Sequence, residues 1–391
     1  MNGNKLLEQV RTSNKKLDPK AVQNVLIIYE LDQSFIGDTV VHAAHLRKFK
    51  YFYPNAKITV NATNPTSFKL IEQITLHNPN IHTLSGSSWS EIPFEGYDVI
   101  IAACMDEKKF ANFYFSKYGG EICQNKKMPA VFSASDSIPS YIKENTYQVF
   151  FDKNGDFISY PFPVDVINSV KCNEIYITSD EIEWANGWLL NNGLCHEDEL
   201  FIFLDSSSTR EKLMRVDVYF QIIDWALKKK NVKILIFDER SAGKVLFYRE
   251  WLRPEQRHRI LSAEGLSLRE GIKLLASTQV KFIFGPSTGL LLCASGIYNK
   301  IKPGGTHKKA PLIISYTGKY NNGYTEHLWW RGTLVEGLLL LKNADGRNQL
   351  TTIQKTDDSI LSNFNLIGAC TEYLPQDILE YIRSRIIEHE L

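Results

Sequence analysis

The sequence predicts an α/β protein made of two doubly wound parallel-sheet domains in tandem. Three observations predict this. The chain has 391 residues, which is long enough for two or three domains that each bury a core. Short β-branched apolar runs alternate with amphipathic segments of helical period, as in parallel-sheet proteins. This pattern restarts just before residue 200, so we expect a second domain of the same kind.

Composition and charge exclude several classes of protein. Hydrophobic residues make up 43% of the chain, aromatic residues 12% and charged residues 23%, which is ordinary for a folded domain and excludes a disordered, collagenous or coiled-coil chain. The 45 Lys and Arg nearly balance the 44 Asp and Glu, giving a net charge of +1. No overall field therefore attracts nucleic acid, and we expect no nucleic-acid partner.

Cysteine spacing and hydropathy suggest a reduced, internal environment. The six cysteines show no CxxC or CxxH spacing, so neither a zinc site nor a disulfide framework is predicted. Residues 1–20 form a polar leader without the apolar core of a signal peptide. No window reaches the roughly 18 apolar residues of a membrane span. We therefore expect a chain that neither crosses a membrane nor carries a recognisable export signal.

The first domain is expected over residues 21–178. The run Val25–Tyr29 reads as a buried parallel strand, residues 39–52 carry a helical pattern that Pro54 ends, and residues 57–61 return to a strand. This is one βαβ unit. Further expected strands are 81–84, 97–102 and 130–132, with helices at 66–76 and 108–118.

An interdomain helix and a second domain follow. Residues 179–195 hold a helix that begins with Ser and acidic residues and ends near Gly193. The second domain, 196–365, is predicted to contain strands at 200–204, 232–237, 280–284 and 312–316, helices at 216–230 and 266–276 and a short apolar helix to 295, with residues 342–365 as loop. In the segment 366–391, a helix at 375–389 has one apolar stripe, and we expect it to pack back toward the first domain.

Chemistry in such sheets is expected in the turns that follow strands, where helix N-termini offer free N–H groups. The first such turn is Ser34–Asp38. Asp38 either caps the following helix or acts as a general base that takes a proton from an acceptor hydroxyl, and the two roles are compatible. Gly37 and His42 lie beside it and are candidates for acceptor contact, although a histidine so placed more often packs.

Two turns of the second domain are candidates for phosphate binding. Residues 206–212 combine hydroxyls with Arg210 and Lys212, cations suited to a diphosphate, although a solvated loop would look the same. Residues 285–289 contain Ser287, Thr288 and Gly289 at a helix start, where small residues let a phosphate approach the backbone; tight helix-to-sheet packing is the alternative. Neither the GxxxxGK[ST] nor the GxGxxG pattern follows the opening strands.

These turns together resemble the family 9 glycosyltransferases, the lipopolysaccharide heptosyltransferase group. The segment SFIGDTVVHAAHLRKFKYFYPNAKITV resembles the family's opening signature, SDEIEWANGWLLNNGL its interdomain helix, and SLREGIKLLASTQVKFIFGPSTGLLLCASGI its donor segment. The resemblance covers about residues 24–317. It implies the GT-B fold, in which two Rossmann-like doubly wound domains face a central cleft.

The resemblance also implies roles. Asp38 is the expected catalytic base, Arg210 and Lys212 contact donor phosphates, and Ser287, Thr288 and Gly289 cradle the diphosphate. Asp238 or Glu239 falls near the nucleoside ribose. The family usually has an Asp where Ser287 stands and a His where Leu292 stands, so the donor and the retention of turnover stay open.

The implied reaction is a metal-independent, inverting transfer from a nucleotide diphosphate sugar, heptose-like or other, to a cell-envelope glycan or glycolipid acceptor. No cofactor is expected beyond this donor substrate, and no metal site is expected because the chain has no DxD motif. The resemblance implies a cytoplasmic enzyme and leaves open a peripheral contact with the inner membrane face. Two alternatives remain: a degenerate GT-B protein that binds nucleotide or glycan without turnover, and a GT-B-like sugar-nucleotide epimerase.

One aromatic segment remains. Trp329, Trp330 and Arg331 form either a stacking platform for a sugar or base, or a cover over the second domain's core, and we favour the cover.

Overall fold

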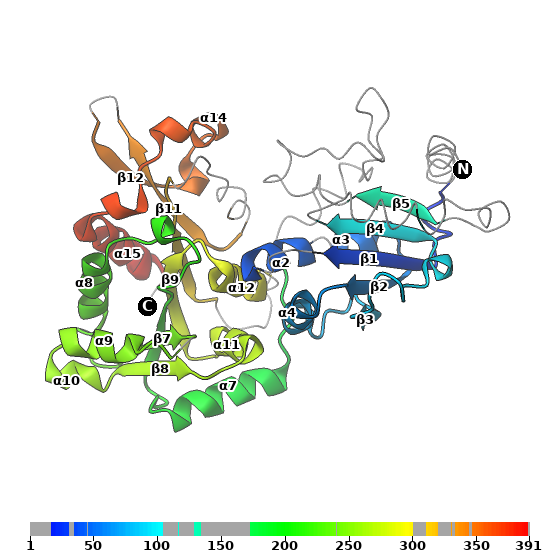
Figure 1. Cartoon of the computed structure of the whole chain (residues 1–391). Coiled ribbons are helices and arrows are strands. Elements are labelled where there is room, and N and C mark those ends of the chain that lie inside the picture. The colour runs from blue at the N-terminus through cyan, green and yellow to red at the C-terminus, as the bar shows by residue number, and fades with distance from the viewer. Residues whose placement is uncertain are drawn as a thin grey trace. The chain divides into compact units, whose positions relative to one another are not determined.

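The computed structural model describes residues 17–30, 35–44, 46–104, 116, 129–133, 173–239, 241–299, 310–319, 330, 333–343 and 346–389. The chain divides into two compact units, Met1–Lys171 and Cys172–Leu391, which we call unit 1 and unit 2 (Figure 1). Each unit has its own sheet.

Unit 1 is built on a five-stranded parallel sheet. Its strands are β1 (Asn24–Glu30), β2 (Lys57–Ala62), β3 (Thr83–Ser85), β4 (Val99–Cys104) and β5 (Ala130–Ser133), in the order β3-β2-β1-β4-β5. β1 is central, with Val25 in register with Ile58 on one side and Val99 on the other. Its apolar run is buried because both faces of a central parallel strand are covered. The expected doubly wound domain is confirmed.

The helices of unit 1 differ from the prediction at one point. The segment expected as a single helix over 39–52 forms two, α2 (Ile36–Ala43) and α3 (Leu46–Phe52), and α2 starts three residues early. Both halves keep the same apolar spacing, so periodicity does not reveal the break between them. α4 (Pro65–Thr75) begins as expected, with Asn64 accepting a 2.8 Å hydrogen bond from the Thr66 amide. Apart from residue 116, the helix expected at 108–118 lies outside the described residues.

Unit 2 contains a seven-stranded sheet in the order β12-β11-β10-β9-β6-β7-β8. The strands are β6 (Glu199–Phe203), β7 (Val232–Asp238), β8 (Ile260–Glu264), β9 (Val280–Pro286), β10 (Leu312–Tyr316), β11 (Glu336–Lys342) and β12 (Asn348–Thr352). All neighbouring pairs are parallel except β11 and β12. The expectation that 342–365 is loop is wrong at β12, an edge strand whose sequence, NQLTT, lacks the apolar alternation that predicts strands.

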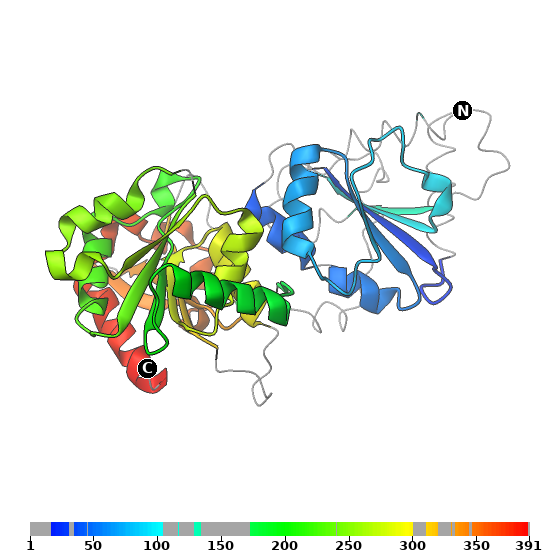
Figure 2. The ribbon, with the colours of Figure 1, turned by 90° about the horizontal axis from the view of Figure 1, so that it is seen from below.

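Helices cover both faces of this sheet (Figures 1 and 2). They are α7 (Ser179–Asn191), α8 (Val216–Ala226), α9 (Lys244–Trp251), α10 (Pro254–Arg257), α11 (Leu268–Leu275), α12 (Gly289–Tyr298), α14 (Asp358–Leu361) and α15 (Pro375–His389). One core cluster joins α8, α9 and α15 to the strands through side chains such as Ile222, Tyr248 and Phe284. Among the described residues, no helix is long and apolar enough to cross a membrane.

α7, expected as the interdomain helix, packs on α11 within unit 2. Each begins with a capping box, Thr178 with Glu181 in α7 and Ser267 with Glu270 in α11. Arg269 joins them: its guanidinium contacts both carboxylate oxygens of Glu181, at 2.8 and 2.7 Å, and the carbonyl of Tyr176 at 2.6 Å. Both side chains are less than a tenth exposed, so this is a fully satisfied buried ion pair.

The last helix contributes to the core of unit 2. α15 contributes Ile378 and Ile382 to the core cluster of unit 2, and it contacts α8 and β10. Arg385 forms an ion pair with Glu336 of β11, and Tyr381 donates to the same carboxylate at 2.8 Å. Ile378 and Ile382 thus add to the core of unit 2, where α8 and the neighbouring strands offer an apolar surface.

Candidate functional site

The point where strand order reverses in unit 2 lies between β6 and β9. β6 is the first strand of the unit, β7 and β8 follow on one side of it, and β9 and β10 lie on the other. Ligands in open α/β sheets bind beyond the carboxyl ends of strands at such a reversal. Both turns predicted for phosphate binding, 206–212 after β6 and 285–289 at the end of β9, are at this edge.

Gly285 allows β9 and β6 to end close together. A Cβ atom at this position would lie 2.6 Å from the Cβ of Leu204 and 2.7 Å from its carbonyl oxygen. The amide of Leu204 also donates to Phe284 at 2.8 Å. Only glycine fits this approach, so the two turns are held side by side.

Helix α12 begins directly after this close approach. Thr288 is the N-cap residue, in extended conformation, with no hydrogen bond from its side chain to the helix. Thr288, Gly289 and Leu290 are half-buried, whereas the rest of the helix up to Ile297 is buried. The first turn of α12 is therefore the part of this helix that a phosphate can approach.

Ser287 faces the interior of unit 2. Its hydroxyl accepts a 2.7 Å hydrogen bond from the indole N–H of Trp330 and shares a 3.0 Å hydrogen bond with Ser315. Its amide donates to the carbonyl of Tyr316 at 3.1 Å. The side chain is 2% exposed, so Ser287 supports the turn from within, unlike the predicted phosphate-contacting hydroxyl. Trp330 is fully buried, as expected for a cover, while Trp329 and Arg331 lie outside the described residues.

The two predicted cations lie on a short 3-10 helix, Arg210–Lys212, after β6. Arg210 is exposed and Lys212 is half-buried. The turn is anchored by buried tyrosines: Tyr219 donates to the carbonyl of Leu204 at 2.9 Å and lies 2.6 Å from the hydroxyl of Tyr316. The cations thus stand on a fixed loop at the same sheet edge as α12.

The two acidic candidates for ribose contact, at the end of β7, differ in how exposed their side chains are. Asp238 is 1% exposed, and its two carboxylate oxygens accept from the amides of Ala242 at 2.7 Å and Lys244 at 2.9 Å. It holds the turn into α9, in which Ser241 and Gly243 have positive φ. Glu239 has a side chain that is 40% exposed. Of the two, Glu239 is the one a ligand can reach.

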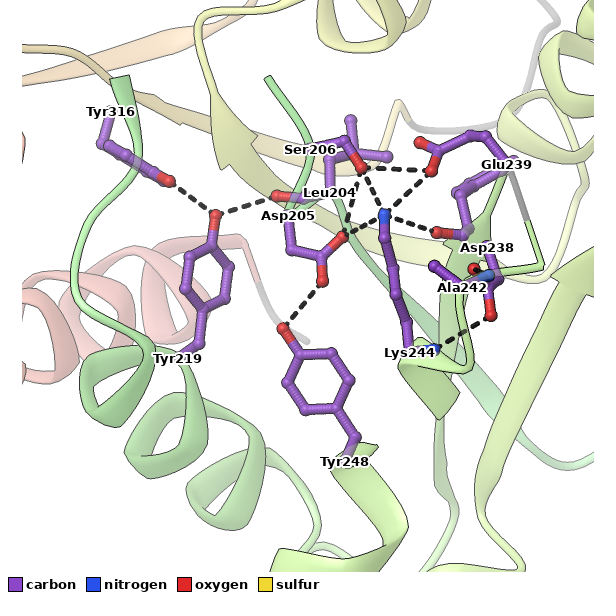
Figure 3. A network of polar contacts seen from close by, with 11 residues as sticks. Leu204, Asp205, Ser206, Tyr219, Asp238, Glu239, Ala242, Lys244, Tyr248 and Tyr316 are labelled. Carbon is purple, nitrogen blue, oxygen red and sulfur yellow. Dashed lines mark hydrogen bonds and ion pairs between the residues drawn. The ribbon is translucent and has the colours of Figure 1, made fainter. Parts of the chain in front are cut away.

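A cluster at this edge was not predicted. The ammonium of Lys244 contacts Asp205 at 3.0 Å, Glu239 at 2.8 Å, the carbonyl of Phe237 at 3.0 Å and the hydroxyl of Ser206 (Figure 3). Tyr248 donates to the other oxygen of Asp205 at 2.9 Å. Partial burial lowers the pKa of Lys244, but the charges of Asp205 and Glu239 outweigh it, so its pKa is raised and it stays cationic. In the sequence, the cluster is marked only by a lysine after FDERSAG, and this segment matches no known motif spacing.

The predicted residues of unit 1 lie on α2. Gly37 and Asp38 are half-buried in its first turn, where a carboxylate suits the helix dipole. His42 is buried against Tyr29, ring centroids 5.2 Å apart and nearly perpendicular. Burial lowers the pKa of His42 to about 4. His42 is therefore a neutral residue packed in the unit 1 core, which fits the packing interpretation and not the acceptor-contact one.

Metal ligands do not gather in the part of the chain that the structure describes: no three His, Cys, Asp or Glu side chains there could hold an ion together. Cys195, Cys293 and Cys370 are free thiols.

Solved structures resemble this chain over nearly its whole length. ADP-heptose LPS heptosyltransferase II of E. coli aligns with 94% of this chain and 100% of its own, at 14% identity and a TM-score of 0.59. A glycosyl transferase of family 9 from Veillonella parvula aligns with 95% of this chain and 99% of its own, at 12% identity and a TM-score of 0.60. The chain has the fold of these glycosyltransferases. The GT-B fold class expected from the sequence is confirmed.

Neither a protein-family model nor a curated protein matches the sequence. The likeness is therefore one of fold, and the chemistry must be argued from the residues.

Proposed function

We propose that this protein is an inverting glycosyltransferase that uses a nucleotide diphosphate sugar. The observation that supports it most is the sheet edge of unit 2: the open first turn of α12, the cations Arg210 and Lys212 and the exposed carboxylate Glu239 follow β9, β6 and β7, within a fold shared with two glycosyltransferases. Amides and cations suit a diphosphate, and a carboxylate suits ribose hydroxyls.

The residues have distinct roles in this proposal. Arg210, Lys212 and the amides of Thr288 and Gly289 stabilise the negative charge that grows on the leaving diphosphate. Asp38 accepts the proton of the acceptor hydroxyl as its oxygen attacks the anomeric carbon. The bond from that carbon to the diphosphate oxygen breaks in the same displacement, which inverts the anomeric centre. No bound metal is required for this route.

The first donor to test is ADP-heptose, since the E. coli enzyme of the same fold is named for it. The proposed acceptor is a glycan or glycolipid of the cell envelope, met at the cytoplasmic face of the membrane. The choice of donor and the choice of acceptor both follow from the sequence resemblance to family 9 glycosyltransferases.

Binding is tested by thermal denaturation and calorimetry with ADP, UDP and GDP. One of these should raise the melting temperature of the wild-type protein by several degrees at millimolar concentration, because a ligand that binds only the folded state stabilises it. Failure of all three would contradict the proposal.

Turnover is tested with Asp38→Asn. Transfer from ADP-heptose to a heptose-deficient lipopolysaccharide acceptor should fall by a factor of about 100 or more, with nucleotide binding retained. Glu72→Gln, an exposed carboxylate change on α4 of the same unit, is the matched control and should keep full activity.

The two alternatives give different results in these assays. Nucleotide binding without transfer to any acceptor would favour a binding protein. That alternative is motivated by the two positions where the resembling family usually has a donor-binding Asp and His. Here they hold Ser287 and Leu292, and both side chains are buried. Conversion of the donor sugar in the absence of acceptor would favour an epimerase.

A further inference from the structure

We propose that Lys244 is a positioning residue that orients the carboxylate of Glu239 to accept the ribose hydroxyls of the bound nucleotide, and so makes the protein selective for ribonucleotides. This inference rests on the proposed function, because it concerns the same nucleotide. Lys244 acts through Glu239 and itself touches no substrate in this proposal.

One carboxylate oxygen of Glu239 is held by two contacts, and the side chain is 40% exposed. Oε2 accepts from Lys244 at 2.8 Å and from Ser206 at 3.1 Å (Figure 3). In the part of the chain that the structure describes, no hydrogen bond or ion pair reaches Oε1. A glutamate otherwise has three free torsions, so two contacts on one oxygen fix where the other points.

Lys244 is itself held from the opposite side. Asp205 at the end of β6 and the carbonyl of Phe237 in β7 each lie 3.0 Å from its ammonium. Tyr248 in turn fixes Asp205. The lysine side chain is 24% exposed and Asp205 only 13%, so solvent screens this chain of contacts less than a surface pair. Glu239 is thus tied to two strands and to α9.

The position of Glu239 suits ribose. It follows the second strand of a β-α-β unit formed by β6, α8 and β7, where an acidic residue in dinucleotide-binding folds accepts from ribose hydroxyls. A site built to bind a hydroxyl rejects the analogue that lacks it, because the polar group is then left unpaired. The discrimination depends on the carboxylate already pointing at the sugar, which is what Lys244 secures.

The test measures dissociation constants by calorimetry for the nucleoside diphosphate that stabilises the protein and for its 2′-deoxy and 3′-deoxy forms. Wild type should prefer the ribose form over at least one deoxy form by about tenfold. Lys244→Met and Glu239→Gln should each bring this ratio near one, with little change in the affinity for the deoxy form. Lys244→Arg should restore part of the preference, and Ser206→Ala, which keeps every charge, should lower it about threefold.

The double variant distinguishes positioning from general support. If Lys244 acts through Glu239, Lys244→Met with Glu239→Gln should weaken binding of the ribose form no further than either single change does. Tyr381→Phe is the matched control: it removes a tyrosine hydrogen bond to a carboxylate, Glu336, outside this cluster, and should leave the ratio unchanged. Circular dichroism confirms that each variant is folded.

A tenfold preference retained in Lys244→Met, or losses that multiply in the double variant, would overturn the inference while leaving nucleotide binding intact. Absence of binding of any nucleoside diphosphate to wild type overturns the proposed function and this inference with it. If Lys244→Met does not fold, a preference left unchanged by Ser206→Ala and Lys244→Arg overturns the inference, and a graded loss supports it.

Discussion

The indole N–H of Trp330 donates a 2.7 Å hydrogen bond to the hydroxyl of Ser287, and both side chains are buried. Ser287 stands where the resembling family usually has an acidic residue. In this protein that position belongs to the core beneath the turn, and the hydroxyl is the acceptor that a fully buried indole requires.

Ser287→Ala should therefore lower the free energy of unfolding by about 1–3 kcal/mol, because it leaves the Trp330 N–H without its partner. Ser315→Ala is the control: it removes the Ser315 to Ser287 contact and keeps the acceptor for the indole, so its cost should be about 1 kcal/mol or less. Urea denaturation followed by tryptophan fluorescence measures both. Equal costs would mean that the indole contact contributes nothing.

Gly285→Ala should destabilise unit 2 by about 1–3 kcal/mol and weaken nucleotide binding, since the new methyl group meets the backbone of Leu204 and separates β9 from β6. Gly187→Ala in the middle of α7 has open space at the same atom and should stabilise by about 0.5–1 kcal/mol. Melting temperatures of the pair check the prediction. A tolerated Gly285→Ala would show that the strands can separate freely.

Arg269→Met should cost up to about 3–5 kcal/mol, because it removes the guanidinium that contacts both oxygens of the buried Glu181 carboxylate and leaves the ammonium of Lys273, 4.0 Å away, as a weaker partner. Adding Glu181→Gln should recover a large part of the loss, since the buried negative charge is then removed. Glu181→Gln keeps a side chain that can still accept from the Thr178 amide in the capping box. Denaturation of the single and double variants tests this, and an additive loss would contradict it.

The unfolding free energy of unit 1 should fall on acidification from pH 6.5 to pH 4. Folded His42, with a pKa of about 4, stays neutral over this range, whereas in the unfolded chain it takes up a proton near pH 6.5. The unfolded state therefore binds more protons, so His42 contributes a loss of about 3 kcal/mol as pH drops, present in full below pH 4 and absent above pH 6.5.

His42→Phe keeps a ring against Tyr29 and removes the titration. The difference between wild type and this variant should shift by about 3 kcal/mol between pH 6.5 and pH 4. The same difference at both pH values would show that His42 does not titrate on unfolding.

Sequence periodicity predicted most strands and helices because buried parallel strands are apolar throughout and caps mark helix starts, as at Asn64 and Thr178. It missed β8 and β12, which lie at the two edges of the sheet, and also β11, an interior strand whose apolar run was not among the predicted strands. The apolar stripe of α15 predicts that this helix packs, but a stripe does not identify the surface it packs on; within unit 2 that surface includes α8 and β10.

The site was predicted at the level of turns and less well at the level of side chains. That residues 206–212 and 287–289 share one sheet edge follows from parallel topology. Whether a side chain faces out or in depends on neighbours distant in sequence, such as Trp330 for Ser287 and Asp205 for Lys244. The spacing of residues within a turn does not identify such distant partners.

The order of strands in unit 2 also bears on how a growing chain folds. β6, β7 and β8 are made first and pair with one another, yet β9, which covers the other edge of β6, begins only at Val280. Until then, an apolar strand end, Phe201 to Leu204, keeps an unpaired edge of the kind that recruits foreign strands. Pairing of β9 with β6 closes that edge, so while residues 204 to 285 are being synthesised the nascent chain carries an edge that is open to aggregation.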